Sequence, residues 1–322
     1  VVGGVVLLQR QVDERIDRVP RRILPAGVLD PSTLTYPMTI LVVGSDSRAF
    51  VSNAQEAQTF GSATDQSGQR ADVMMLVRLT ATGVTVVSLP RDLLVDDHGT
   101  SRQLNSFFDH GPAALIDAIK TNLDVQINHY VQVDFRSFIK VVDAAGGLRM
   151  NVPAPIRDTY SGLDVAVPGC TNFDGDRALA FVRSRHLEAY DGQRWIDRSG
   201  AGDLDRIHRQ QMFLQDLLAK TKAQVGADLG SVQRMADAVI SSLTVDSQLG
   251  RGAIADLVHR FVQDDPATWT FLTLPVGPAP NDPNRLVTTG PLGDALFAPI
   301  INRGIALLPD PHAVPAGLGD PC

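Results

Sequence analysis

Arg183 and Arg185 stand one residue apart at the end of the stretch ALAFVRSRH, which covers residues 178–186. Arginine keeps its charge at physiological pH and binds a phosphate group through two parallel N–H bonds. In an unbroken helix the two side chains would point about 200° apart. Both can hold one anion only if the chain leaves the helix near Arg183 and continues extended, because alternate residues then share a side. The spacing therefore predicts a helix exit beside an anion-binding site.

More charged and polar residues stand where predicted strands begin or end, in the segments GSDSR, QRAD and LPRD, and in the later segment DLDRIHRQQ. The candidate residues in these segments are Asp46, Arg70, Asp72, Arg91, Asp92, Arg206, Arg209 and Gln210. Arg206 and Gln210 share a helix face because they are four residues apart. Ligand sites of open α/β sheets form where strands give way to loops, so these segments predict one common site.

Each of these residues also has an ordinary structural interpretation. Asp46 can simply form a turn, and Arg70 with Asp72 can be a surface ion pair worth less than about 1 kcal/mol. The PRD segment can end a strand, and the arginine pair can be a solvated helix end, where cations suit the helix dipole. The sequence contains neither GxxxxGK[ST] nor GxSxG, which excludes a Walker-type phosphate loop and a serine-esterase nucleophile elbow.

Apolar periodicity predicts the elements that must position these residues. Strands are expected at 38–43, 73–79, 84–89, 129–135 and 269–276. Helices are expected at 112–123, from 135 to a stop at Gly146, from a cap at Asp174, at 205–222 and near 231–242. The alternation of strands and helices predicts an α/β protein, an α-β-α sandwich with helices on both faces of a central mixed β-sheet.

The composition excludes several classes of protein. The 322 residues carry a net charge of −7, and no basic tract or helix-turn-helix pattern occurs, so a nucleic-acid binder is not expected. The seven histidines are scattered and the two cysteines form no CxxC motif, which argues against a zinc site. Cys170 and Cys322 are two free thiols or, if the protein is exported, a disulfide.

The order of the motifs resembles the LytR-CpsA-Psr (LCP) family of cell-wall glycopolymer phosphotransferases. The resemblance rests on ILVVGSDSR, RADVMMLVRL, VVSLPRD, INHYVQVDFRSFIKVVDAAGGL, FDGDRALAFVRSRH and DRIHRQQMFL, in this order over about 37–220. It implies an enzyme that takes a glycopolymer from a polyprenyl-pyrophosphate carrier. The enzyme then joins the glycopolymer to peptidoglycan through a phosphodiester, usually at the 6-hydroxyl of an N-acetylmuramic acid. It also implies a hydrophobic prenyl-lipid cleft and Mg²⁺ as the cofactor, with Mn²⁺ as an alternative.

The same resemblance implies roles for the motif residues. Asp46 and Asp72 match the metal-binding aspartates. The positions that contact pyrophosphate or substrate are matched by Arg70, Arg91, Arg183, Arg185, Arg206, Arg209 and Gln210, with Lys120 as a looser match. Asp92 is expected to orient Arg91, and a role as base toward the acceptor hydroxyl is the alternative.

Two departures from the family pattern bear on the site. Asp205 stands where the family usually has glycine, so the loop backbone or the local charge is expected to differ. The segment 186–202 is longer than in many members. We interpret it as a lid or an acceptor-recognition loop in which Arg194, Trp195 and Arg198 contact sugar or phosphate. A flexible surface insert is the alternative.

The resemblance also implies an organisation. Residues 1–36 are expected to be a membrane-proximal segment, 37–309 a single catalytic domain and 310–322 a C-terminal tail. The eight apolar residues that open the sequence are too few to span a bilayer, which takes about 20. They are expected to be the end of a single transmembrane anchor at the extracytoplasmic face. Export favours a Cys170–Cys322 disulfide, which would stabilise the fold by about 4–5 kcal/mol.

Two other functions fit the same residues. A pyrophosphatase would use the same site with water as the acceptor. A regulatory protein would bind polyprenyl phosphate without chemistry, although lipid binding alone does not need paired aspartates. The alanine- and arginine-rich composition suggests a high-GC actinobacterium and therefore arabinogalactan as the donor glycan, with teichoic acid and capsule as alternatives.

Overall fold

The structure is a computed structural model of the whole chain. It describes residues 19–31, 36–45, 71–200, 202–225, 237–238, 243–250, 252–254, 257, 264–265, 268–297, 318–320 and 322. Among these residues, no helix combines the length and the apolar character that crossing a membrane requires.

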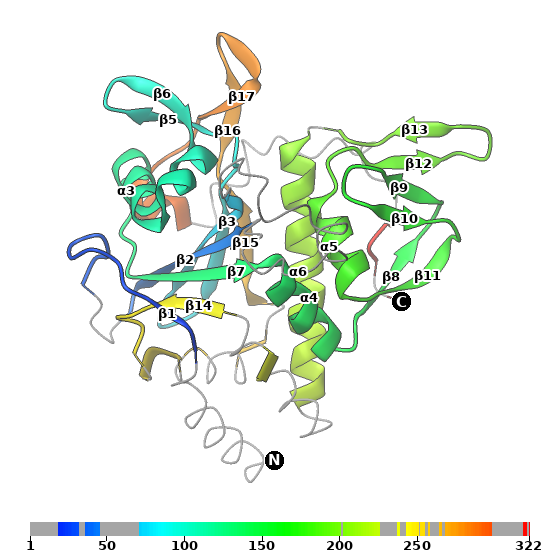
Figure 1. Cartoon of the computed structure of the whole chain (residues 1–322), viewed down its shortest axis with the longest axis horizontal. Coiled ribbons are helices and arrows are strands. Elements are labelled where there is room, and N and C mark those ends of the chain that lie inside the picture. The colour runs from blue at the N-terminus through cyan, green and yellow to red at the C-terminus, as the bar shows by residue number, and fades with distance from the viewer. Residues whose placement is uncertain are drawn as a thin grey trace, which may run out of the picture.

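A seven-stranded mixed sheet forms the larger part of the fold (Figure 1). Its strand order is β1 (Arg21–Arg22), β14 (Leu243–Asp246), β7 (His129–Asp134), β2 (Met38–Ser45), β3 (Ala71–Leu79), β4 (Val84–Ser88) and β15 (Thr270–Thr273). The central strand β2 runs antiparallel to β3 and parallel to β7. Both faces of β2 are covered, which explains why its sequence is almost continuously apolar.

Helices cover both faces of this sheet. On one face, α3 (Pro112–Leu123) and the 3₁₀ helix η1 (Leu104–His110) share a core with Leu41 and Val43 of β2. The other face carries Ile40 and Val42 and packs against α6 (Asp203–Val225). Two shorter helices, α4 (Phe135–Ala144) and α5 (Gly175–Arg183), lie beside α6. The α-β-α sandwich with a mixed sheet is therefore confirmed.

A smaller lobe lies across α6 from the seven-stranded sheet (Figure 1). Its sheets are β10 (Leu163–Val165), β9 (Ile156–Asp158), β12 (Glu188–Tyr190) and β13 (Trp195–Asp197), and the pair β8 (Leu148–Val152) and β11 (Gly169–Phe173). A separate apolar core, which includes Phe173, Phe181 and Phe213, joins these strands to the three helices. Within the segment 186–202, residues 188–197 form the β12–β13 hairpin at the edge of this lobe.

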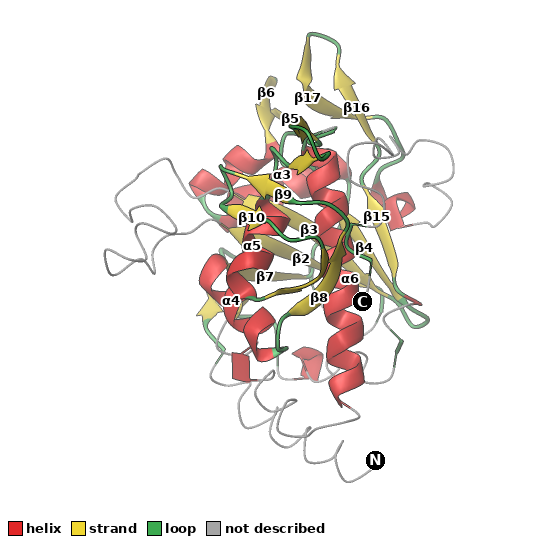
Figure 2. Ribbon diagram, turned by 90° about the vertical axis from the view of Figure 1, so that its right-hand side faces the viewer, coloured by secondary structure: helices red, strands yellow, loops and turns green. Residues whose placement is uncertain are grey.

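Two further hairpins and a short helix complete the described fold. The hairpins are β5 (Leu94–Asp97) with β6 (Thr100–Gln103), and β16 (Val276–Ala279) with β17 (Asp282–Thr288). Figure 2 shows both at the same end of the molecule. A 3₁₀ helix, η3 (Gly293–Phe297), places Leu296 and Phe297 in the core that α3 covers.

The limits of α5 follow from its sequence. Asp174 precedes the helix, and its Oδ1 accepts a hydrogen bond from the backbone N–H of Arg177 at 3.0 Å. The helix ends at Arg183 because Ser184 has extended backbone angles, with φ −56° and ψ 130°. The predicted helix exit between the two arginines is confirmed.

Most predicted elements are present close to their predicted bounds, including α3, α4, α6 and the strands β2, β3, β4 and β7. The strand expected at 269–276 is divided into β15 and the start of β16. The helix expected near 231–242 lies almost entirely outside the described residues.

Described residues on both sides of 37–309, the range predicted for the catalytic domain, pack against that range. On the N-terminal side, β1 pairs with β14, and Val28 and Leu29 are buried in the core beneath α3. On the C-terminal side, Leu318 is buried in the core of the smaller lobe, and Asn151 exchanges backbone hydrogen bonds with residues 319 and 320. Val28, Leu29 and Leu318 therefore share their cores with residues of the predicted range.

Candidate active site

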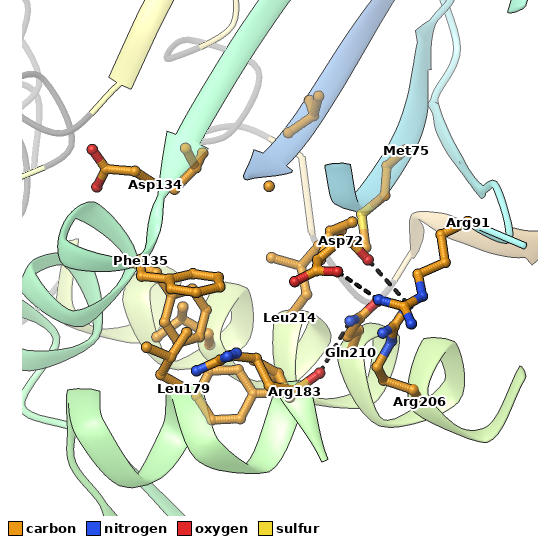
Figure 3. A pocket seen from close by; sticks show the side chains of 18 of the residues that line it. Asp72, Met75, Arg91, Asp134, Phe135, Leu179, Arg183, Arg206, Gln210 and Leu214 are labelled. Atoms are coloured by element: carbon orange, nitrogen blue, oxygen red, sulfur yellow. Dashed lines mark hydrogen bonds and ion pairs between the residues drawn. The ribbon is translucent and has the colours of Figure 1, made fainter. Parts of the chain in front are cut away.

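A cavity of about 300 Å³ opens between the seven-stranded sheet and the helices α4, α5 and α6 (Figure 3). The residues that line it are Val42, Gly44, Asp72, Val73, Met75, Arg91, Val133, Asp134, Phe135, Phe138, Leu179, Val182, Arg183, Arg185, Arg206, Gln210, Phe213, Leu214 and Leu217. Most of the wall is aliphatic or aromatic, whereas the charged groups come mainly from the arginines. An apolar cavity with a few convergent polar groups is the usual form of a small-molecule site.

The sheet and α6 both contribute to the apolar wall. Val42 and Met75 face α6 from the central strands, and Leu214 lies opposite them on the helix. Phe135, the first residue of α4, carries the guanidinium of Arg183 over its ring at 4.3 Å. Arg183 therefore links the apolar wall to the charged mouth, and Figure 3 shows the two side chains stacked.

Three acidic residues hold Arg91, which follows β4 in the chain. Its Nη1 donates to Asp72 Oδ1 at 2.7 Å, and its backbone N–H donates to Asp203 Oδ2 at 3.1 Å. Its Nε lies 3.6 Å from Asp92 Oδ2. Burial opposes the charge of Arg91, but Asp72, Asp203 and Asp92 outweigh it and raise the pKa of the guanidinium. Arg91 is therefore a fixed cation at the cavity mouth.

Asp203, for which the sequence motif predicts no role, lies beside Arg91 and Arg206 and does not line the cavity. It is only 6% exposed, forms an ion pair with Arg206, and lies 3.8 Å from Arg91 Nε. Burial raises the pKa of Asp203, the charge of Arg206 lowers it, and the nearby charge of Asp92 raises it further. The Asp203 carboxyl group therefore orients Arg91 and Arg206 toward the cavity.

Asp92 is the centre of a second charged group. Its Oδ1 accepts from Gln103 Nε2 at 2.7 Å, and its Oδ2 accepts from Arg185 Nη2 at 3.4 Å. Arg285 on β17 approaches from a third direction, with Nη1 3.7 Å from Asp92 Oδ1. Because Asp92 is surrounded by donors and does not line the cavity, the geometry favours its orienting role over the alternative role as a base.

Arg285 is a further cation beside Asp92 that no sequence motif indicates. It lies on the β16–β17 hairpin, beyond the motifs, and no spacing in the sequence marks it. The hairpin is brought to the site by a bridge between Leu93 and Leu286 and by the hydrogen bond from the backbone N–H of Leu286 to the Asp92 carbonyl. Only the tertiary pairing of these two segments places Arg285 beside Asp92.

Arg206 and Gln210 lie on one face of α6 and both reach the cavity, as their spacing predicts. Arg206 Nη2 donates to the carbonyl of Asp72 at 3.1 Å. Gln210 Nε2 donates to the carbonyl of Val182 at 3.0 Å, near the end of α5. The two side chains thus tie α6 to both sides of the cavity mouth.

Arg209, which is predicted to contact substrate, is not among the residues that line the cavity. Its side chain is 0% exposed, and its Nη2 donates to the carbonyl of Ser184 at 2.5 Å. Burial lowers the pKa of Arg209 to about 10, while the charge of Asp205 opposes this. Asp205, which stands where the family usually has glycine, is also fully buried. The replacement of the usual glycine by Asp205 therefore places a buried negative charge near the buried guanidinium of Arg209.

Lys120 and Arg194 also lie apart from the cavity. Lys120 Nζ lies 3.0 Å from Asp30 Oδ1 and donates to the carbonyl of Val28, so it joins α3 to the N-terminal segment. Arg194 lies in the β12–β13 turn, where its backbone N–H donates to Asp191, and its side chain is exposed. Neither residue lines the cavity.

Two predicted site residues, Asp46 and Arg70, lie outside the described residues. Ser45, which precedes Asp46, pairs with Ala71, which precedes Asp72. The part of the chain that the structure describes has no cluster of three side chains able to hold a metal. Mg²⁺ commonly takes one or two carboxylates together with waters and substrate phosphates. The carboxylate of Asp72 at the cavity mouth fits such a partly substrate-bound ion.

Cys170 on β11 and Cys322 form a disulfide that closes a loop of 152 residues in sequence separation. The bond anchors the last residue of the chain to the smaller lobe. It lies away from the cavity, because neither cysteine is among the lining residues.

The LytR_cpsA_psr family matches residues 10–289, which is most of the chain. The chain belongs to the LytR_cpsA_psr family. The family resemblance that the motif order indicated is thereby confirmed.

Individual LCP relatives agree with this assignment. LcpB of Corynebacterium glutamicum, named as a probable cell wall biosynthesis protein, is 32% identical over 182 residues, which cover 56% of this chain and 41% of LcpB. TagU of Bacillus cereus, named as a polyisoprenyl-teichoic acid–peptidoglycan teichoic acid transferase, is 29% identical over 189 residues, which cover 57% of this chain and 52% of TagU. The chain therefore spans about half the length of these relatives.

A solved structure of a LytR-Csp2A-Psr enzyme from Actinomyces oris superposes with a TM-score of 0.70 and 27% sequence identity. The match covers 88% of this chain and 98% of that structure. The fold described above is therefore an LCP fold, with the charged mouth and the apolar cavity on adjoining surfaces of one site.

Proposed function

We propose that this protein transfers a glycopolymer from a polyprenyl-pyrophosphate carrier to peptidoglycan and forms a phosphodiester bond. One observation carries the proposal: four arginines, Arg91, Arg183, Arg185 and Arg206, line the same cavity as a continuous apolar wall. A polyprenyl pyrophosphate has the matching chemistry, with a charged diphosphate at one end of a long hydrocarbon chain. The name of TagU, with its polyisoprenyl-linked donor and peptidoglycan acceptor, supports the same substrate class.

In the proposed reaction, the acceptor hydroxyl oxygen attacks the phosphorus next to the sugar. A new P–O bond forms to peptidoglycan, the bond from that phosphorus to the bridging oxygen breaks, and polyprenyl monophosphate leaves. The hydroxyl proton is released to solvent or to a base. Negative charge grows on the leaving phosphate, and preorganised cations aimed at developing charge are the largest common source of catalysis. Arg91, Arg183, Arg185 and Arg206 are the groups proposed to stabilise it.

We further propose that Asp72 holds Mg²⁺, with Asp46 as the second protein ligand and Mn²⁺ as an alternative ion. A bound divalent cation would neutralise charge on the diphosphate oxygens. Asp72 is suited to this because it is already fixed by Arg91 at the cavity mouth. Asp92, held by Gln103 and two arginines, is proposed to orient Arg185 and Arg91.

We propose the extracytoplasmic face of the membrane as the working location, with an N-terminal anchor. The Cys170–Cys322 disulfide supports this, because disulfides persist in oxidising compartments. We propose arabinogalactan as the donor glycan, on the basis of the alanine- and arginine-rich sequence.

The test is to incubate the protein with a polyprenyl-pyrophosphate-linked glycan, Mg²⁺ and peptidoglycan. Glycan that becomes bound to the wall supports the transferase. Soluble sugar phosphate without wall-bound glycan would instead support the pyrophosphatase. Donor that stays intact would refute both enzymes and leave a lipid-binding protein.

A further inference from the structure

Asp158, the last residue of β9, is a buried carboxylate with an unusual number of donors. It is 1% exposed, and its Oδ2 accepts three hydrogen bonds from the segment after α5. These come from Ser184 Oγ at 2.7 Å, Arg185 N at 2.9 Å and His186 N at 2.9 Å. Its Oδ1 accepts from the backbone N–H groups of Tyr160 and Ser161. Five hydrogen-bond donors thus converge on this one carboxylate.

The hydrogen-bond donors around Asp158 explain why a charged residue occupies this buried position. The helix ends at Arg183, so the N–H groups of Arg185 and His186 have no helical acceptor. A carboxylate forms stronger hydrogen bonds to such groups than a neutral acceptor does. Burial works against the charge, but these hydrogen bonds hold the pKa of Asp158 below its ordinary value. The group therefore stays ionised at neutral pH.

The peptide bond between Ser184 and Arg185 is held at both ends. Its N–H, on Arg185, donates to Asp158, and its C=O, on Ser184, accepts from Nη2 of buried Arg209. Gln210 holds the carbonyl of Val182 two residues earlier. The orientation of this peptide plane determines the direction in which the Arg185 side chain leaves the backbone. Arg185 then lines the cavity and reaches Asp92 Oδ2 at 3.4 Å.

We propose that Asp158 is a positioning residue that fixes Arg185 in the cavity mouth by holding the Ser184–Arg185 peptide against Arg209. Asp158 does not line the cavity itself, and it contacts Arg185 through the backbone N–H alone. The inference rests on the proposed function, since it concerns the same diphosphate site. A misplacement of a catalytic group by about 1 Å can cost about 100-fold in rate. Loss of this one carboxylate is therefore expected to be visible in catalysis.

The first experiment compares Asp158→Asn with Asp174→Ala, the matched control at the other end of α5. Asp174 caps the start of that helix through one backbone hydrogen bond, so its loss loosens α5 without removing a contact to the segment that follows the helix. We expect Asp158→Asn to lower kcat for transfer about 10-fold and Asp174→Ala to leave it unchanged. An equal effect of the two variants, at equal loss of thermal stability, would overturn the proposal.

The second experiment is a double-mutant cycle with Arg185→Ala, because residues that act through one another are not additive. The cycle is measured on the binding of geranylgeranyl pyrophosphate, which needs no residual turnover. If Asp158 acts through Arg185, adding Asp158→Asn to Arg185→Ala causes no further loss of binding. If the two losses multiply, the positioning role is refuted. Should Asp158→Asn fail to fold, Ser184→Ala removes one donor to the same carboxylate, and the same cycle applies to it.

The proposed transferase site and the positioning role of Asp158 would be contradicted by different results. If Arg185→Ala leaves transfer intact, the proposed site is wrong and the positioning role falls with it. If Arg185→Ala abolishes transfer but Asp158→Asn is as active as the wild type, only the positioning role is wrong. Binding of geranylgeranyl pyrophosphate, measured by calorimetry, provides a readout independent of turnover and is expected to weaken in both variants.

Discussion

Arg91 donates a hydrogen bond from Nη1 to Oδ1 of Asp72 over 2.7 Å, and this contact joins the loop after β4 to the start of β3. The pair combines a cation that would face the diphosphate with the carboxylate proposed to hold Mg²⁺. Each side chain is largely buried, at 15% and 18% exposure, so solvent screens the pair only partly. One contact therefore couples the two charged components of the proposed site.

Arg91→Lys is expected to reduce transfer by about 100-fold, because lysine keeps the charge but cannot contact Asp72, Asp92 and Asp203 in a fork. Arg102→Lys is the matched control: Arg102 pairs with Asp97 on the neighbouring β5–β6 hairpin and does not line the cavity. Steady-state kinetics of both variants would check this. Full activity of Arg91→Lys would mean that charge alone suffices at this position.

Leu214→Trp is expected to fill the apolar part of the cavity and weaken binding of geranylgeranyl pyrophosphate at least about 10-fold, because the hydrocarbon chain loses its space. Inorganic pyrophosphate should bind as before, since the arginines are unchanged. Leu214→Met, which conserves volume, serves as the control. Equal weakening of both ligands would show that the cavity does not hold the lipid.

The parts of the site that could be predicted depend on residues that are close together in sequence. Apolar periodicity and the Asp174 cap were enough to predict α5, and the spacing of Arg183 and Arg185 predicted its exit. The four-residue spacing of Arg206 and Gln210 likewise placed both on the cavity face of α6. These features depend on helix geometry, which the sequence alone determines.

What could not be predicted depends on tertiary contacts. Arg209 is a neighbour of Gln210 in sequence, yet it turns into the protein to meet Ser184. Lys120 lies on α3, which packs on the sheet face opposite the cavity. Asp158 and Arg285 reach the site only through the pairing of distant segments. No residue spacing in the sequence predicts these tertiary contacts.

Cys170→Ala is expected to lower the free energy of unfolding by about 5 kcal/mol, because the disulfide shortens the accessible unfolded chain over 152 residues. Urea unfolding with and without reductant measures this. Reductant should destabilise the wild type to the level of Cys170→Ala and leave that variant unchanged. A reductant effect of equal size in both proteins would contradict the disulfide's role.

Stability is expected to fall as the pH drops below 3.8, the ordinary pKa of an aspartate. Burial opposes the charge of Asp246, but hydrogen bonds from His129, Tyr130 and Gln248 hold its pKa below that value. The unfolded chain then binds the proton first, so the stabilisation present above pH 3.8 is lost as the pH falls through the lower, folded pKa.

The corresponding measurement is urea unfolding of the wild type and Asp246→Asn over the acid range. The wild type should lose up to about 1.4 kcal/mol more per pH unit than the variant, the value for one additional proton bound on unfolding. Parallel curves for the two proteins would show that Asp246 does not contribute to the acid transition.

The most direct measurement follows the phosphorus atom next to the sugar. A polyprenyl-pyrophosphate glycan radiolabelled at that phosphorus is incubated with the protein, Mg²⁺ and peptidoglycan, and the wall is then washed and digested. We predict labelled phosphodiester on the wall, unlabelled polyprenyl monophosphate in the lipid fraction, and neither product with Arg185→Ala. Label that appears only in soluble sugar phosphate, or equal transfer by Arg185→Ala, would contradict the proposed transferase site.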